Sequence, residues 1–191
     1  MALSFLALAR TVQGDVIHYS TTMSGPNESP SNASLGVGTA DVFYDTTLHT
    51  MHVMVSFSGL TGTTTASHIH APTLMPDTGT AGIATVTPNF TGFPLGVTSG
   101  TYDHTYDMFA VGGFGTAYMA GNGGTFASAE AAFLSAMDNE KAYLNVHSSF
   151  VPSGEIRGFM HRVPDAASTA ALLALGLAAM LGYARNQRRF A

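Results

Sequence analysis

The sequence predicts an all-β fold, an antiparallel β-sandwich or Greek-key barrel with one short inserted helix and an apolar helix at the C-terminus. Short runs rich in β-branched and aromatic residues recur along residues 15–162, and Gly, Pro and Asp separate them. One of these runs alternates with the two-residue period of a strand that buries one face. Short strands at this spacing are typical of sandwiches and barrels.

Three strands are predicted near the N-terminus. The first covers residues 16–24 and the second residues 36–44, both rich in β-branched and aromatic side chains. The third covers residues 51–58. Its apolar side chains recur at every second position, at Met51, Val53, Val55 and Phe57. Between the second and third runs, Asp45-Thr46-Thr47 predicts a hairpin turn.

Three further strand candidates follow, at residues 67–71, 83–87 and 98–106. The glycine-rich residues 112–124 are expected to form a flexible loop. After this loop, side chains three or four apart define a helix: Phe126, Glu130, Phe133, Leu134 and Met137. We expect the helix to begin near Thr125 and to pack its apolar side on one end of the sheet.

Two histidines stand on one face of a predicted strand. His68 and His70 flank Ile69, and side chains alternate between the faces of a strand, so both imidazoles point the same way. Residues 143–147 and 155–159 then predict a hairpin. Its first strand places three polar side chains on one face: Tyr143, Asn145 and His147. In a matching register, two residues of the second strand lie beside Asn145 and His147: Glu155 and Arg157.

A His-x-His pair with a third histidine from a neighbouring strand suits copper or zinc, because neutral imidazole nitrogens bind both ions. The candidate ligands are His68, His70, His147 and Glu155. Glu155 would serve either as a fourth ligand or as the acceptor that orients an imidazole. The His-x-His element is similar to that of copper-zinc superoxide dismutase, but the bridging histidine and zinc loop of that enzyme have no counterpart here.

A structural cluster is the alternative interpretation of the same residues. Histidines on a half-exposed sheet face can exchange hydrogen bonds with Tyr143, Asn145 or Arg157 and hold the sheet edges together. Imidazoles that converge on one point would favour a metal ion, and rings bonded to the backbone or to Arg157 would favour the cluster. Both interpretations stay open at the level of sequence.

These stretches together resemble the CHRD domain, first described in chordin and widespread in bacterial secreted proteins. The resemblance runs from about residue 16 to about residue 161, with Ala71 in place of the usual glycine and a longer segment at residues 112–124. The positions that match the family motifs are His68, His70, Pro72, Asn145, His147, Gly154, Glu155, Arg157 and Gly158. The resemblance implies an exported β-domain, and we expect this domain to bind or scaffold.

Composition narrows the function classes. The chain has no cysteine, which excludes disulfides and thiolate chemistry. Between residues 11 and 162, three basic residues stand against eleven acidic ones, a charge of about −8 that argues against nucleic acid as a partner. The sequence contains no Gly-x-Ser-x-Gly elbow, phosphate-binding glycine loop or His-Glu-x-x-His motif, so we expect no enzyme.

Both ends of the chain indicate targeting. Residues 1–14 are similar to the remnant of a signal peptide, with an apolar run that Arg10 interrupts. At the other end, residues 163–191 resemble a PEP-CTERM sorting tail. Its parts are the Val163-Pro164-Asp165 motif, an apolar run and a basic end with Arg185, Arg188 and Arg189. The apolar run has roughly 14 residues, fewer than the ~20 that span a bilayer comfortably. A plain C-terminal anchor helix is the alternative.

We therefore expect a domain at residues 15–162 that is exported to the cell envelope or extracellular matrix. The tail would anchor it transiently in the inner membrane until an exosortase-type protease cuts near Val163-Pro164-Asp165. Its partner would be an extracellular polysaccharide or protein. The competing expectation is a copper- or zinc-binding β-sandwich metalloprotein, with the site at the histidines described above.

Overall fold

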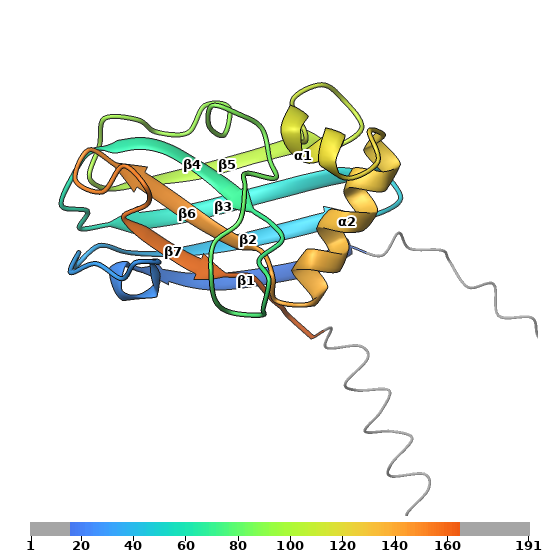
Figure 1. Ribbon diagram of the computed structural model, residues 1–191. Coiled ribbons are helices and arrows are strands. Elements are labelled where there is room, and N and C mark those ends of the chain that lie inside the picture. Colours follow the sequence, from blue (N-terminus) through green and yellow to red (C-terminus); the bar gives the residue numbers. More distant parts are fainter. Residues whose placement is uncertain (1–15, 165–191) are drawn as a thin grey trace, which may run out of the picture.

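The computed structural model describes residues 16–164, and this part of the chain contains eight strands, two α-helices and one short 3₁₀ turn (Figure 1). The strands are β1 (Val16–Ser24), β2 (Val37–Asp45), β3 (Thr50–Ser58), β4 (Thr64–His70), β5 (Gly100–Asp107), β6 (Tyr143–Ser148), β7 (Ile156–Phe159) and β8 (His161–Arg162). The helices are α1 (Thr116–Gly121) and α2 (Phe126–Asp138), and the 3₁₀ turn η1 is Gly25–Asn27. The all-β prediction is confirmed.

The strands form one antiparallel sheet in the order β4-β6-β7-β1-β2-β3-β5, with β8 beside β1. At the register position Ser24↔Arg157, β7 joins β1. The sheet curls there, so that β4, β6 and β7 lie in front of β1, β2 and β3 (Figure 1). The predicted sandwich or barrel is thus a curled half-barrel, in which two parts of the same sheet face each other.

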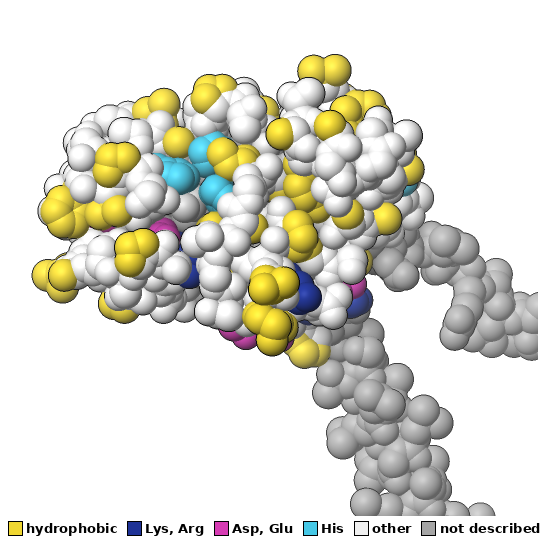
Figure 2. All heavy atoms as spheres, viewed as in Figure 1, with side chains coloured by type: hydrophobic (Ala, Val, Ile, Leu, Met, Phe, Trp, Pro, Cys, Tyr) yellow, Lys and Arg dark blue, Asp and Glu magenta, His cyan; other side chains and the backbone are white. Residues whose placement is uncertain are grey.

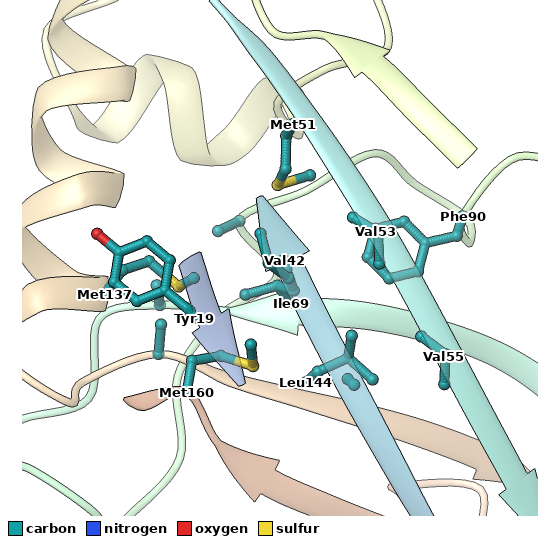
Figure 3. Packing of buried hydrophobic residues seen from close by; sticks show 14 of the residues in the cluster. Tyr19, Val42, Met51, Val53, Val55, Ile69, Phe90, Met137, Leu144 and Met160 are labelled. Atoms are coloured by element: carbon teal, nitrogen blue, oxygen red, sulfur yellow. The ribbon is translucent and has the colours of Figure 1, made fainter. Parts of the chain in front are cut away.

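The core fills the space between these two parts of the sheet (Figure 3). Tyr19, Val42 and Val53 of the first part are fully buried, as are Ile69 and Leu144 of the second. Burying each aliphatic side chain of this size stabilises the fold by roughly 1.5–3 kcal/mol. The alternation along β3, and the placement of Leu144 and Val146 along β6, therefore direct one face of each strand to a shared core.

Helix α2 closes one end of the curled sheet. It begins after Thr125, whose side chain accepts a hydrogen bond from the backbone of Ser128 in a capping box. Its buried residues include Phe133, whose ring packs 6.2 Å from that of Tyr44. The hydroxyl of Tyr44 donates to Glu130 at 2.9 Å. The predicted helix, its start and its position at a sheet end are confirmed.

The segment between β4 and β5 differs from the prediction. Residues 83–87 do not form a strand, and their ladder contacts are the isolated bridges His70↔Ile83 and Thr85↔Phe114. One reason is local: the backbone N–H of Ile69 donates to the side chain of Thr85 instead of to a backbone carbonyl. Further along, Thr64 and Gly96 bond through their backbones, which brings this segment beside β4.

The loop predicted at residues 112–124 also needs correction, because it contains helix α1. Tyr118 of α1 is buried, and its ring lies edge-on to that of Phe133 at 6.5 Å. Packing on α2 thus stabilises a helix of six residues, too short to persist by its own propensity. The turn predicted after β2 is confirmed, since Asp45 accepts hydrogen bonds from the backbones of Thr47 and Leu48.

Several predictions about the two ends of the chain lie outside the described residues. They are the signal-peptide remnant at residues 1–14 and the C-terminal apolar helix with Asp165, Arg185, Arg188 and Arg189. Val163 and Pro164 are the last described residues, and the backbone of Val163 donates to the carbonyl of His18. Within residues 16–164, no helix is long and apolar enough to cross a membrane.

Gly158→Ala should destabilise the fold strongly. A Cβ atom at Gly158 would overlap the hydroxyl of Thr21 and the backbone carbonyl of Thr22, where β7 passes β1. We expect a loss of about 3 kcal/mol in the free energy of unfolding, measured by urea titration followed by circular dichroism. Gly121→Ala, whose Cβ would meet open space, is the control and should leave stability equal or slightly higher.

Candidate functional site

The antiparallel pairing of β4 with β6 brings the predicted histidines together. His68 pairs with Asn145 and His70 with Tyr143. His147 lies two residues beyond Asn145 on β6, opposite Ala66. Their side chains project from the face opposite Ile69, which points into the core. Figure 2 shows histidine side chains gathered on the molecular face that carries β4 and β6. The predicted sharing of faces on both strands is confirmed.

The three imidazoles converge through one nitrogen each. The ligand atoms of His68, His70 and His147 all lie within 4.8 Å of one another. The closest recorded approach joins His68 Nδ1 and His147 Nε2, at 3.2 Å. Two nitrogens that bind one zinc or copper ion at about 2.0 Å lie about 3.3–3.5 Å apart, so this spacing fits a shared ion.

The other nitrogen of each ring is bonded to a backbone carbonyl. His68 Nε2 lies 2.6 Å from the carbonyl of Pro88, His70 Nδ1 lies 2.9 Å from that of Ala81, and His147 Nδ1 lies 2.9 Å from that of Pro152. A carbonyl can only accept, so each outer nitrogen carries the N–H. A neutral imidazole has one N–H, and its inner nitrogen therefore presents a lone pair.

Burial keeps all three rings neutral. It lowers the pKa of His68 to about 4, with the carbonyl of Pro88 opposing the shift, and it also lowers the pKa of His70 and of His147. Neutral rings with outward N–H groups leave three lone pairs facing one another. Among the described residues, His70 Nε2 is buried without any hydrogen-bond partner. The cluster is therefore short of a positive group or a donor at its centre.

Converging imidazoles were expected to favour a metal ion, and rings bonded to the backbone to favour a structural cluster. The two arrangements do not exclude each other, so this expectation was wrong. Imidazole has two nitrogens, and here the outer ones bond the backbone while the inner ones converge. Bonding of the outer N–H to a carbonyl is also how proteins orient histidines that bind metal ions. The rings bond neither Tyr143 nor Arg157 by hydrogen bonds. His70 instead stacks on Tyr143, with centroids 4.9 Å apart, and burial lowers the pKa of His70 more than its contact with the Asn145 side chain raises it.

Glu155 does not join the histidines. Its carboxylate accepts from the hydroxyls of Ser34 and Ser148 and from the backbone N–H groups of Thr61 and Gly62. Burial alone would raise the pKa of Glu155, but these four hydrogen bonds outweigh it and lower the pKa. The predicted roles of Glu155 as a fourth ligand or as an acceptor for an imidazole do not fit this geometry.

Arg157 lies opposite Asn145, as predicted, and lines a polar cleft separate from the histidine cluster. Its Nε donates to the carbonyl of Asn27 at 2.5 Å and its Nη1 to that of Gly79 at 2.8 Å. Nε also lies 3.7 Å from Glu28, whose pKa burial raises to about 7 although Arg157 opposes the shift. The guanidinium stands 4.7 Å from the centroid of the Tyr143 ring. A polar cleft of about 470 Å³ lies beside this ion pair.

The remaining motif positions are Pro72, Asn145, Gly154 and Gly158, and their contacts indicate structural roles. Pro72 lies in the loop that leaves β4, and Asn145 Oδ1 is buried without a hydrogen-bond partner among the described residues. Gly154 has φ of 134°, and a Cβ there would lie 2.6 Å from Glu28 Oε1. Gly158 allows the close passage of β7 over β1 described above. These glycines therefore set backbone geometry and contribute no chemistry.

Sequence reasoning missed a surface group and the carbonyls that orient the rings. His161 lies 3.4 Å from both Asp77 and Glu140, and all three side chains are about half exposed. Exposed pairs of this kind contribute little to stability. Neither this group nor the carbonyls of Ala81 and Pro88 has a signal in sequence, because the contacts join distant segments and partly use backbone atoms.

Comparison with known proteins gives one family. The model of the CHRD domain matches residues 19–160, which include both histidine-bearing strands and the Glu155 loop contacts. No curated protein and no solved structure matches the chain significantly.

Glu155→Gln should lower the free energy of unfolding at neutral pH by about 3 kcal/mol, because an amide NH₂ replaces an acceptor that faces four donors. The folded pKa of Glu155 lies below its unfolded value. Its stabilisation is therefore present above the unfolded pKa and is lost as pH falls through the folded pKa. Urea titrations at neutral pH and near pH 4 should show a smaller difference between wild type and variant in acid.

Glu140→Gln is the matched control, because the side chain of Glu140 is 47% exposed and contacts the solvent-facing His161. It should change stability by no more than about 0.5 kcal/mol. Equal effects of the two substitutions would contradict the role given to Glu155.

Proposed function

Since the chain belongs to the CHRD domain family, we propose that it is an exported, non-enzymatic binding domain of the cell envelope or extracellular matrix. The family match supports an extracellular binding domain. The surplus of acidic residues supports a partner other than nucleic acid, and the polar cleft beside Arg157 supports an extracellular polysaccharide or a protein. The absence of familiar catalytic motifs from the sequence supports a binding role.

The C-terminal residues support a route to that location. Val163-Pro164-Asp165, an apolar run and a basic end follow one another as in a PEP-CTERM sorting tail. On this proposal, the tail holds the exported chain in the inner membrane, with Arg185, Arg188 and Arg189 on the cytoplasmic side. An exosortase-type protease then cuts near Val163-Pro164-Asp165 and releases or transfers the folded domain.

The histidine cluster supports a second candidate function, in which the domain binds a copper or zinc ion. The observation that carries it is the pattern of lone pairs at the inner nitrogens of His68, His70 and His147. A structural cluster would pair each donor with an acceptor, but three acceptors that face one another cannot bond among themselves. A cation at the shared point satisfies all three at once.

The metal assignment predicts about one equivalent of copper or zinc in the exported, untagged full chain, measured by elemental analysis. His68→Ala combined with His70→Ala should abolish binding, because one imidazole alone holds such an ion weakly. The control is His52→Ala, which removes a histidine bonded to Asp103 on the outside of β3 and should keep the metal. Metal-free wild type with native circular dichroism, or metal retained in the double variant, would count against this candidate.

The sorting proposal predicts that the full chain shortens in a host with an exosortase-type protease. Changing Pro164→Ala together with Asp165→Ala should leave the chain at full length and in the membrane fraction, because the cleavage motif is lost. Pro26→Ala, which alters a proline in η1, is the control and should be processed normally. Fractionation and intact-mass measurement distinguish these results. If the wild-type chain is neither associated with the membrane nor shortened, the sorting proposal is wrong.

A further inference from the structure

The cluster that would hold a metal ion contains no negative charge. Among the described residues, the ligand atoms that converge with His68 include two other imidazoles and no carboxylate. Both oxygens of Glu155 are occupied by donors from two loops and from the end of β6. The chain has no cysteine, so no thiolate can approach. The three rings are neutral ligands, so they offset none of the positive charge of a bound ion.

A fixed positive charge lies beside the same cluster. Arg157 contacts the ring of Tyr143, and His70 stacks on that ring as well. The guanidinium therefore lies one aromatic ring away from the imidazole of His70. Glu28, the ionic partner of Arg157, is held by burial at a pKa of about 7 and balances the guanidinium in part. The surroundings therefore oppose further positive charge.

Burial of the histidines increases the free-energy cost of placing a positive ion among them. His68 and His70 are 3% and 8% exposed. The cost of moving an ion out of water grows with the square of its charge, so a divalent ion meets about four times the penalty of a monovalent one of equal size. Zinc sites usually offset that penalty with thiolates, carboxylates or a bound hydroxide. Three neutral rings supply no charge themselves, and the burial of His68 and His70 disfavours the water or hydroxide that completes a three-histidine zinc site, which favours a monovalent ion.

Copper(I) combines a single charge with affinity for imidazole. It is a closed-shell ion without a geometric preference of its own, and it accepts three nitrogen donors with no water. Two nitrogens placed about 2.0 Å from a trigonal ion lie about 3.5 Å apart. The 3.2 Å between His68 Nδ1 and His147 Nε2 requires a small adjustment to reach that value.

Building on the metal-binding function proposed above, we propose that the cluster is a copper(I) site. The ion is bound by His68 Nδ1, His70 Nε2 and His147 Nε2, in preference to zinc or copper(II). His70 Nε2, which is buried and unpartnered among the described residues, gains its missing partner. The carbonyls of Pro88, Ala81 and Pro152 hold the rings in this orientation before the ion arrives.

The test is an anaerobic titration of the full chain with copper(I) against a chromophoric copper(I) chelator, and a parallel titration with zinc against a zinc chelator. The expected Kd for copper(I) is lower than that for zinc by at least about a hundredfold, or about 2.7 kcal/mol. Zinc bound as tightly as copper(I) overturns the copper(I) assignment and leaves metal binding standing. If neither ion binds, both the assignment and the metal-binding function fail.

A charge variant tests the reason for the preference. Asn145 pairs with His68 across the strands, and its Oδ1 is buried without a partner among the described residues. Asn145→Asp adds one negative charge beside the cluster, so it should favour zinc over copper(I) by at least about tenfold relative to wild type. The matched control is Asn139→Asp at the exposed end of α2, which should leave the ratio unchanged. An unchanged ratio in Asn145→Asp would refute the electrostatic argument.

Discussion

The buried carboxylate of Glu155 is the constraint on which the loop end of the sheet depends. It accepts hydrogen bonds from Ser34, Thr61 and Gly62, which belong to two different loops, and from Ser148 at the end of β6. Burying a charge is costly, and several charge-assisted hydrogen bonds offset that cost when their geometry is good. Ser148 also accepts from the backbone of the loop that ends β6. That loop carries Pro152, so the same carboxylate helps to place the carbonyl that orients His147.

The histidine cluster depends equally on the pleat of β4 and β6. Because alternate side chains point to opposite faces, Ile69 and Leu144 enter the core while His68 and His70 stand on the other side of the same strands. A shift of register by one residue would exchange the two sets and is opposed by the whole core. The face on which the cluster stands is therefore fixed by the register of the sheet.

Glu28 and Glu155 show how surroundings decide the behaviour of identical groups. Both are buried, but four donors outweigh burial at Glu155 and lower its pKa, whereas burial dominates at Glu28 and raises its pKa to about 7. Arg157 links Glu28 to the ring of Tyr143, which in turn stacks on His70. This chain of contacts connects the polar cleft to the histidine cluster and places the positive charge of Arg157 beside it.

Local composition and residue periodicity determined the strands at residues 16–24 and 51–58, helix α2 and the shared face of His68 and His70. These features follow from local geometry, which repeats every two or 3.6 residues and leaves a pattern in the chain. The family motifs also marked Glu155 and Arg157. Tertiary structure decided that Glu155 turns away from the histidines, that residues 83–87 form no strand and that three carbonyls orient the rings. Those outcomes arise from contacts between distant segments, many of them through backbone atoms that every residue shares, and such contacts leave no pattern in a single sequence.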